Sequence, residues 1–290
     1  MENFETQYLA ILREILEKGN ERSSRNGETL SKFGMQMKFD LTNLPLLTTK
    51  KIFTKGIIGE LLWFLKGKTS TEYLNKNGIH IWDKNSSRES LNKRGLDHYK
   101  EGTCGPIYGF QWRHFNAEYF GPGDTYQGKG IDQLKNIIQL INTEPHSRRI
   151  FMSAWNPQQQ TEMCLEPCHV SYQFYVNQNK LSCHMYQRSC DVFLGLPFNM
   201  ASVSILTCII AKMCDLIPSE ITISFGDIHI YKEHISQCKE QLTRNIMPHT
   251  STLKINKNIQ KVEDIEKLEI SDFVIENYHS HGAIKAIMLA

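Results

Sequence analysis

The chain has 290 residues, of which 40% are hydrophobic and 22% are charged, and its 33 basic and 31 acidic residues leave a formal net charge of +2. A chain of this length and composition can bury a large core, which excludes a disordered protein and allows one large domain or two small ones. Because the charge is nearly balanced, electrostatics gives no reason to expect a membrane or nucleic-acid partner, and a bound anion would need a local group of cations.

The start of the chain indicates where the protein works. Residues 1–5 have neither the basic start nor the apolar core of a secretion signal, so we expect a cytoplasmic protein; entry into a nucleus and a viral origin stay open. In a reducing compartment cysteines stay thiols, and most should be small buried residues. The eight cysteines are at positions 104, 164, 168, 183, 190, 208, 214 and 238.

The first half of the chain predicts helices and loops. Residues 4–18 carry apolar side chains at helical spacing and are followed by Gly19 as a cap, which predicts an amphipathic helix. Residues 56–67 are apolar nearly all round and bounded by glycine, which predicts a buried helix. The polar segment 84–103 and the glycine-rich segment 121–130 are expected to be loops.

The second half of the chain changes to the pattern of strands. Residues 150–152 and 170–176 are strand-like, and the second run continues through a turn into 181–186, which predicts a hairpin. The apolar run 199–214 is too short for a membrane span and is expected to be a core helix. No linker or repeat divides the chain, so we predict a single domain, residues 1–290, of the α/β class (α+β type), with a mixed or largely antiparallel sheet covered by helices.

Cys168 stands out among the cysteines because it follows Glu166 and Pro167 and comes just before a predicted strand. A proline turn can present a thiol at the end of a sheet, but Cys168 can equally be one more buried thiol. A nucleophilic role needs a lowered thiol pKa and therefore nearby cations. Arg188 and the arginine pair at 148–149 could supply them and bind phosphate, although adjacent arginines are also typical of a solvated surface.

Two Cys-His dipeptides, at 168–169 and 183–184, raise the alternative of a zinc site. Neighbouring residues of a strand point to opposite faces of the sheet, so each pair is poorly placed to share one metal ion, and we expect no metal. A cysteine hydrolase is another alternative, because a base could be supplied in space by His184, His229 or His234.

Glu60 is the second informative residue, because Trp63 and Phe64 lie one helical turn further along an apolar helix. A carboxylate surrounded by aromatic rings tends to have a raised pKa, which suits proton transfer near neutral pH. The alternative is a carboxylate at a helix N-terminus, where the helix dipole stabilises it.

Two further segments have patterns that suit ligand binding. In residues 191–199, Gly195 and Pro197 are expected to form a turn-rich segment around a ligand. Polar and apolar residues alternate over 226–231 as in a strand, which places Asp227, His229 and Tyr231 on one face. This row could bind a sugar hydroxyl, or the segment could be an ordinary half-exposed strand.

Short stretches along nearly the whole chain together resemble the thymidylate synthase family. They are LSKFG at 30–34, PLLTTK at 45–50, ELLWF at 60–64, GPIYGFQWR at 105–113, RRI at 148–150, PCH at 167–169, QRSCD at 187–191, GLPFN at 195–199 and GDIHIY at 226–231. The resemblance implies a methyltransferase that converts dUMP to dTMP by reductive methylation, with 5,10-methylenetetrahydrofolate as co-substrate and dihydrofolate as the second product. It also implies a homodimer, and no metal or nicotinamide, because the folate is itself the reductant.

Carried over residue by residue, the resemblance implies a nucleophile, Cys168, that adds to carbon 6 of uracil. The other catalytic residues would be Glu60, Tyr108 and Asp191. The residues expected to bind dUMP are Arg25, Arg148, Arg149, Cys168, His169, Arg188, Ser189, Cys190, Asp191, Asn199, His229, Ile230 and Tyr231, of which Arg148 and Arg149 would come from the second subunit. Those expected to bind folate are Trp82, Asn85, Asp191, Leu194, Gly195, Phe198 and Leu289.

The chain departs from the family pattern at a few positions. The loop 26–29 is shorter than usual, and Glu166 replaces a small residue or proline beside the nucleophile. Lys51 and Val203 replace a frequent arginine and a usual tyrosine, and residues 288–290 differ from the usual end. Each change could tune folate affinity, but none removes a required group.

The nearest rival within the resemblance is a deoxycytidylate hydroxymethylase, which shares the fold and the nucleophile. That enzyme would be expected to read cytosine with aspartate at position 199, whereas Asn199 can both donate and accept and so matches the carbonyl and N–H of uracil. A non-catalytic protein of this fold would be expected to lack Cys168 or Glu60, and both are present. The sequence therefore favours dUMP as the substrate.

Overall fold

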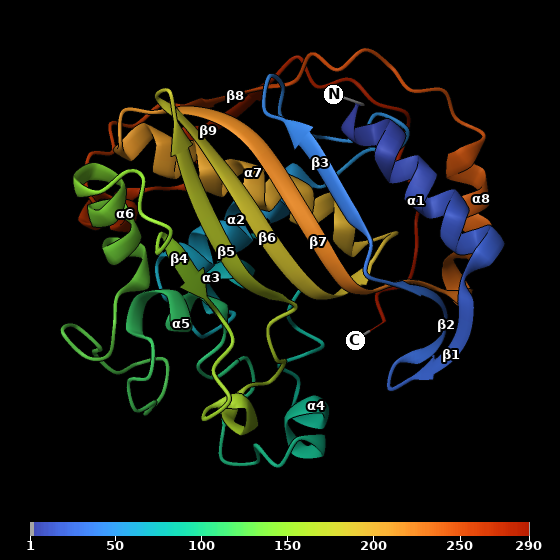
Figure 1. Cartoon of the computed structure of the whole chain (residues 1–290). Helices are drawn as coiled ribbons and strands as arrows, with labels where there is room; N and C mark the ends of the chain where they lie inside the picture. The colour runs from blue at the N-terminus through green and yellow to red at the C-terminus, as the bar shows by residue number, and fades with distance from the viewer. Residues whose placement is uncertain (1–2, 290) are drawn as a thin grey trace.

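A mixed sheet forms the centre of the computed structural model, which describes residues 3–289 (Figure 1). Within these residues the sheet has seven strands in the order β1-β2-β7-β6-β5-β4, and β3 also pairs with β7. Every pairing is antiparallel except that of β6 with β7, so the predicted mixed and largely antiparallel sheet is confirmed. The strands, with the separate pair β8 and β9, are β1 Asn20–Ser24, β2 Gly27–Phe33, β3 Gln36–Asp40, β4 Phe151–Ser153, β5 His169–Asn177, β6 Lys180–Asp191, β7 Ile217–Tyr231, β8 Thr252–Ile255 and β9 Phe273–Glu276.

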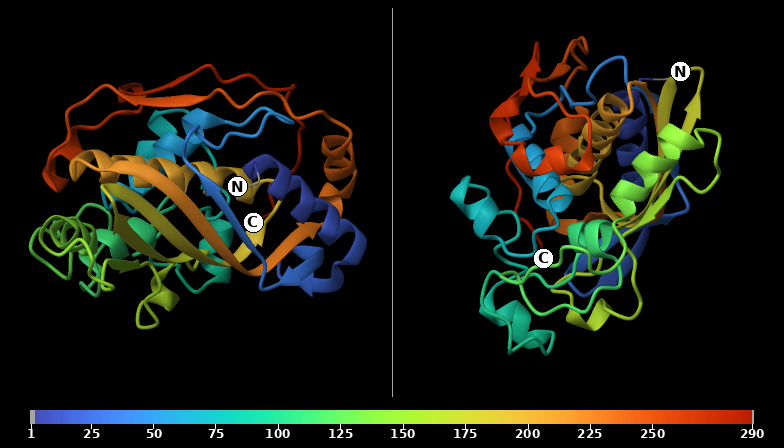
Figure 2. Two further views of the ribbon diagram at one scale, coloured as in Figure 1. Left: turned by 45° about the horizontal axis from the view of Figure 1, so that its top comes forward. Right: turned by 90° about the vertical axis from the view of Figure 1, so that its left-hand side faces the viewer.

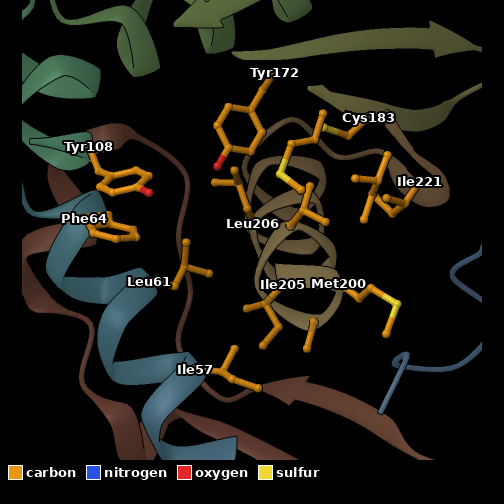
Figure 3. Packing of buried hydrophobic residues seen from close by; sticks show 14 of the residues in the cluster. Ile57, Leu61, Phe64, Tyr108, Tyr172, Cys183, Met200, Ile205, Leu206 and Ile221 are labelled. Carbon is orange, nitrogen blue, oxygen red and sulfur yellow. The ribbon is translucent and has the colours of Figure 1, made fainter. Parts of the chain in front are cut away.

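Alternation along the strands decides which side chains enter the core. Phe174 on β5, Cys183 on β6 and Ile221 on β7 are buried. Helices α2 (Thr54–Leu65) and α7 (Gly195–Met213) lie behind the sheet, and their apolar side chains pack toward it (Figure 3). The opposite face carries no helix among residues 3–289 (Figure 1). Tyr175 on β5 and Tyr186 on β6 are exposed.

Helix α7 is the core helix predicted from the apolar run 199–214, but it begins at Gly195. By length and composition alone, this 19-residue helix could cross a membrane. However, 83% of its most apolar 18-residue stretch is buried inside the protein, as in a core helix. Pro197 is tolerated because a residue in the first turn has no backbone partner for its N–H within the helix. The turn-rich segment predicted for 191–199 is wrong in extent, since the turn covers only 192–194.

Most other predicted elements agree with the structure. Both predicted helices of the first half are present as α1 (Phe4–Lys18) and α2, the hairpin is present as β5 and β6, and residues 121–130 contain no helix or strand. The loop predicted for 84–103 is wrong in part, because Ser87 caps a short helix, α4 (Arg88–Lys93), by accepting a hydrogen bond from the backbone of Ser90. The remaining α-helices are α3 Glu72–Lys76, α5 Tyr108–His114, α6 Gln133–Thr143 and α8 Ile235–Leu242.

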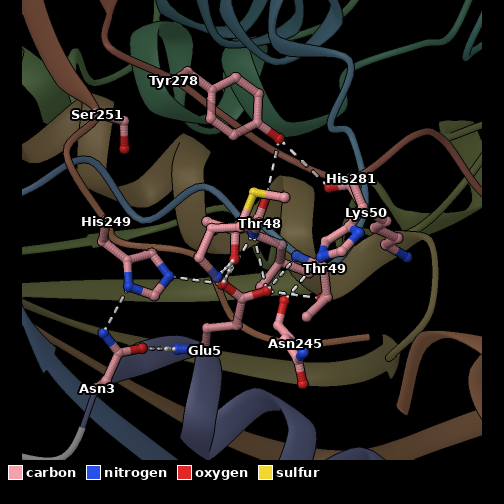
Figure 4. Close-up of polar contacts among 12 residues, drawn as sticks. Asn3, Glu5, Thr48, Thr49, Lys50, Asn245, His249, Ser251, Tyr278 and His281 are labelled. Atoms are coloured by element: carbon pink, nitrogen blue, oxygen red, sulfur yellow. Dashed lines mark hydrogen bonds and ion pairs between the residues drawn. The ribbon is translucent and has the colours of Figure 1, made fainter. Parts of the chain in front are cut away.

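The C-terminal part of the chain runs along the helices on the side away from the sheet (Figure 2). A buried polar cluster anchors it. The Glu5 carboxylate accepts hydrogen bonds from the backbone of Thr48 and Thr49 and from His249 (Figure 4). The backbone N–H of His281 donates to the carbonyl of Thr48 over 2.8 Å, so the same segment also holds the chain that leads toward Leu289. Ala290 lies outside the described residues.

Candidate active site

A cavity of about 920 Å³ lies at the edge of the sheet where β6 and β7 end. Because these strands are parallel, their carboxyl ends meet at one edge, and the antiparallel β5 begins there. Parts of α2 and α7, the β1–β2 turn and the C-terminal residues complete its wall. The predicted site residues that line the cavity are Arg25, Glu60, Trp82, Asn85, Tyr108, Cys168, His169, Arg188, Ser189, Asp191, Leu194, Gly195, Phe198, Asn199, His229, Tyr231 and Leu289.

The structure does not bring every predicted side chain to this cavity. Cys190 and Ile230 are buried in the core, because they alternate with neighbours that do line it, so only their backbone can face a ligand. Arg149 is exposed and pairs with Glu144 over 3.0 Å. Arg148 lines a separate cavity of about 280 Å³.

Hydrogen bonds to the backbone hold Cys168 in place. Its N–H donates to the Tyr108 hydroxyl over 2.6 Å, and its carbonyl accepts from the backbone N–H of Arg188 over 2.9 Å. Burial raises the pKa of the Cys168 thiol above its ordinary value, although the Arg188 charge and the Tyr108 hydroxyl lower it. The lowered pKa expected for a nucleophile is therefore not found in the single chain.

Arg188 is fixed beside the nucleophile rather than free in solvent. Its Nε donates to the carbonyl of Pro167 over 2.9 Å and one terminal nitrogen donates to the carbonyl of Glu166 over 2.8 Å. The guanidinium also lies 5.4 Å from the centre of the Trp155 ring. The N–H groups that these contacts leave can meet an anion in the cavity.

Glu60 lies in the middle of α2, so the alternative of a carboxylate at a helix N-terminus is wrong. Burial raises the pKa of its carboxyl to about 7. The indole N–H of Trp82 donates a 2.7 Å hydrogen bond to this carboxyl, which lowers the pKa and so opposes the effect of burial. The expectation of a raised pKa is confirmed, and the group can hold or release a proton near neutral pH.

Asn199 has a fixed orientation in the first turns of α7. Gln187 donates from its side-chain nitrogen to the Asn199 Oδ1 over 2.8 Å, which leaves the amide N–H₂ as a donor for a ligand. Burial lowers the pKa of His169 to about 4, so its ring is neutral at pH 7, and a hydrogen bond with Asn199 partly opposes this shift. The cavity thus presents neutral polar groups where β5 meets α7.

Asp191 ends β6 and shapes the start of α7. Its Oδ1 accepts from the backbone N–H groups of Phe193 and Leu194 over 2.9 and 3.2 Å. Lys50, which is not among the residues predicted from the sequence although it ends the PLLTTK stretch, is buried, donates to the Phe193 carbonyl and lies 3.5 Å from the centre of its ring. Burial lowers the pKa of Lys50 to about 7, although the Asp191 charge raises it.

The predicted row on β7 is present, since Asp227, His229 and Tyr231 all line the cavity. His229 Nδ1 lies 2.9 Å from Asp227 Oδ1, and this hydrogen bond is the main reason why the pKa of Asp227 is below its ordinary value. Arg22 pairs with the other Asp227 oxygen over 2.6 Å, and Asn26 is hydrogen-bonded to Tyr231. No local pattern marks Arg22 or Asn26, because only the pairing of β1 and β2 beside β7 brings them here.

Metal ligands do not gather at this site. Among residues 3–289 no group of at least three His, Cys, Asp or Glu side chains is arranged to hold a metal ion. Cys183 is buried on the inner face of β6 while the His184 Nε2 pairs with Ser224 over 2.8 Å on the outer side, as strand alternation requires. The cavity is instead lined by a thiol, carboxylates, guanidinium groups and amides.

The chain is similar to known proteins along nearly its whole length. The thymidylate synthase family model matches residues 6–290. The thymidylate synthase of Herpesvirus ateles is 49% identical over 286 residues, covering 98% of this chain and 97% of the relative, and that of Saccharomyces cerevisiae is 48% identical over 297 residues, covering 98% and 96%. A bifunctional dihydrofolate reductase-thymidylate synthase of Zea mays is 49% identical over 286 residues, and the chain spans about half, 54%, of that longer relative. The chain belongs to the thymidylate synthase family.

Proposed function

We propose that the chain catalyses the reductive methylation of dUMP to dTMP, with 5,10-methylenetetrahydrofolate as the one-carbon donor and reductant and dihydrofolate as the second product. The observation that carries the proposal is the gathering of Cys168, Glu60, Asn199 and Asp191 in one cavity of about 920 Å³. Membership of the thymidylate synthase family supports it. The deoxycytidylate hydroxymethylase alternative and the cysteine hydrolase alternative have no such support.

The reaction requires a nucleophile that later leaves. The Cys168 thiolate adds to carbon 6 of uracil, and carbon 5 then attacks the methylene carbon of the opened folate. The carbon 5 proton is lost, the bond between the methylene and the folate nitrogen breaks, and hydride passes from tetrahydrofolate to the exocyclic methylene. Release of the thiolate gives dTMP and dihydrofolate, so atoms and electrons balance without a metal or nicotinamide.

Proton transfer falls to Glu60 and Tyr108 in this proposal. A carboxyl with a pKa of about 7 can be protonated in one step and ionised in the next, which suits the proton movements around the uracil ring. The Tyr108 hydroxyl, 2.6 Å from the backbone nitrogen of Cys168, lies beside the nucleophile. It therefore fixes the backbone of the nucleophile and can orient a water molecule or proton.

The nucleotide and the folate divide the cavity between them. The phosphate would be bound by Arg25, Arg188 and Ser189, the uracil by Asn199 with neutral His169 nearby, and the sugar hydroxyl by His229 and Tyr231. The pterin would meet Asp191, and the remaining folate contacts would come from Trp82, Asn85, Leu194, Gly195, Phe198 and Leu289. All of these side chains or glycines line the same cavity.

A homodimer would complete the site. The outer face of the sheet exposes large hydrophobic side chains, with Phe151 48%, Tyr175 65% and Tyr186 40% exposed, which is the kind of surface that a protein covers with a partner. Arg148 borders a cavity with Tyr175 there, away from its own chain's active site. In a twofold dimer formed through this face, Arg148 and Arg149 would reach the phosphate in the partner's site.

We also propose a cytoplasmic location. All eight cysteines are free thiols, and all lie within residues 3–289. A reducing compartment keeps thiols in this state. Fractionation of cells that express the tagged chain would test the location, and recovery of the protein in a membrane or secreted fraction would contradict it.

The decisive test is intact mass spectrometry after incubation with 5-fluoro-dUMP and 5,10-methylenetetrahydrofolate. Fluorine cannot leave as the carbon 5 proton does, so the covalent complex should accumulate on the parent chain, and peptide mapping should place it on Cys168. The Cys190→Ala variant, whose thiol is buried behind the cavity, is the matched control and should still form the complex. No adduct on the parent chain, or an adduct on another cysteine, would contradict the proposal.

A further inference from the structure

The turn that presents the nucleophile is held by guanidinium groups on both sides. Arg188 donates to the carbonyls of Glu166 and Pro167, as described above. On the other side, Arg94 donates from Nε to the carbonyl of Met163 over 2.9 Å and from a terminal nitrogen to the Glu166 carboxylate over 2.5 Å. Arg94 therefore bridges the start of the turn and the residue two positions before Cys168.

Arg94 comes from a segment far from the turn in the sequence. It is the C-cap residue of α4, in the polar stretch 84–103 that the sequence alone predicts to be a loop. Its side chain is 19% exposed and that of Glu166 is 30% exposed, and both line the active-site cavity. A planar guanidinium that binds a carbonyl and a carboxylate at once is held more firmly than a single surface ion pair.

The negative charge of the Glu166 carboxylate lies close to the Cys168 thiol in the sequence. Burial is the largest single influence on Glu166 and works against its ionisation. The hydrogen bond and charge of Arg94, a backbone hydrogen bond and the Arg188 charge together outweigh burial and leave the pKa of this carboxyl below its ordinary value. A carboxylate so close to Cys168 disfavours the thiolate, and the groups that act in the opposite direction are Arg188, Tyr108 and Arg25. Without a counter-ion, Glu166 would also repel a phosphate bound by Arg25 and Arg188.

We propose that Arg94 is a positioning residue for the nucleophile, and that it acts through Glu166 by neutralising the carboxylate next to the Cys168 turn. The pair gives the turn a rigid bridge to α4 without leaving an uncompensated negative charge beside the thiol. The inference rests on the proposed function for the importance of Cys168, but not for its test. Glu166, a departure from the family pattern, would be tolerated here because Arg94 accompanies it.

The test measures the rate at which iodoacetamide alkylates Cys168 in the ligand-free protein between pH 6 and 9, followed by mass spectrometry of the Cys168 peptide. R94M leaves Glu166 uncompensated and should slow alkylation near pH 7 by about two- to fivefold, the size expected for a partly exposed ion pair. E166Q should accelerate it. The double variant R94M/E166Q should behave like E166Q, because Arg94 then has no carboxylate to neutralise.

Further variants separate charge from structure. R94K keeps the charge and should retain most of the parent rate, whereas K93M, which removes the exposed pair of Lys93 with Glu89 on the same helix, should leave the rate unchanged. Equal slowing by R94M in the parent and E166Q backgrounds would overturn the proposal, as would a parent-like rate in R94M. If R94M fails to fold, E166Q alone tests the proposal. An alkylation rate of Cys168 that is unchanged or slower in E166Q would contradict the proposal that the Glu166 charge disfavours the thiolate.

The outcome is independent of turnover. Alkylation needs only the free thiol, so a parent chain that makes no dTMP would contradict the proposed function and still leave this measurement valid. Conversely, if the parent makes dTMP but the alkylation rate of Cys168 does not change on substitution of Arg94 or Glu166, only the role of Arg94 is contradicted.

Discussion

Replacing Glu60 by glutamine should separate stability from catalysis. Burial raises the pKa of this carboxyl from its ordinary value of 4.5 to about 7. Between those pH values Glu60 is protonated in the folded protein but ionised in the unfolded chain, so the folded protein binds more protons and loses stability as the pH rises. Glutamine stays neutral at every pH, and its side-chain oxygen can still accept the 2.7 Å hydrogen bond from Trp82.

The magnitude follows from the difference between pKa values of about 7 and 4.5, which corresponds to about 3 kcal/mol at 1.36 kcal/mol per pH unit. This cost of ionising Glu60 is absent below pH 4.5 and complete above pH 7. The free energy of unfolding of E60Q should therefore exceed that of the parent by less than about 1 kcal/mol near pH 5 and by up to about 3 kcal/mol at pH 8.5. The same substitution removes the proton that the reaction needs, so dTMP formation should fall.

Urea unfolding of both proteins at pH 5, 7 and 8.5 measures the stability difference, with the protein concentration fixed because a dimer's stability depends on it. Formation of dTMP and trapping of 5-fluoro-dUMP are measured on the same samples, and trapping should survive where turnover fails. A stability difference that does not change with pH would refute the raised pKa. An unimpaired kcat in E60Q would refute the role of Glu60 in proton transfer.

Three further experiments test the remaining roles. Cys168→Ala should reduce dTMP formation to less than about a thousandth of the parent rate, a loss of about 4 kcal/mol in transition-state stabilisation, yet retain dUMP binding by calorimetry; faster turnover would exclude Cys168 as the nucleophile. Asn199→Asp should lower the ratio of kcat/KM for dUMP to that for dCMP, and an unchanged ratio would remove Asn199 from base recognition. Reassorted Cys168→Ser and Arg149→Ala chains should regain activity as heterodimers, and no recovery would contradict shared sites.

Local patterns predicted part of the fold, namely helices α1, α2 and most of α7 and the hairpin of β5 and β6. The strand-favouring residues of 170–176 and 181–186, with a turn between them, predict both strands of the hairpin. The start of α7 was harder to predict, since Gly195 and Pro197 are common breakers. They are compatible with a helix here because they fall in its first turn, where no backbone hydrogen bond is lost.

Predicting the site needed more than local patterns. Neighbouring residues of a strand point to opposite faces, which argues against zinc and also keeps the side chains of Cys190 and Ile230 out of the cavity. The sequence motifs that contain these two residues do not reveal which of their side chains face the cavity. Lys50 and Arg94 reach the site through contacts with Phe193 and Glu166 that are distant in the sequence. Such residues carry no periodic signal, because tertiary packing alone determines what they touch.

The charges around Cys168 explain why a single chain is an incomplete enzyme in this proposal. Arg22 is paired with Asp227 and Arg94 with Glu166, while part of the Arg188 guanidinium is bound to backbone carbonyls. A nucleotide phosphate carries a charge close to −2 at neutral pH, and beside the thiol it would raise the thiol pKa further unless more cations accompany it. Arginines from a second subunit would supply that charge, so assembly would provide both phosphate binding and an ionisable nucleophile.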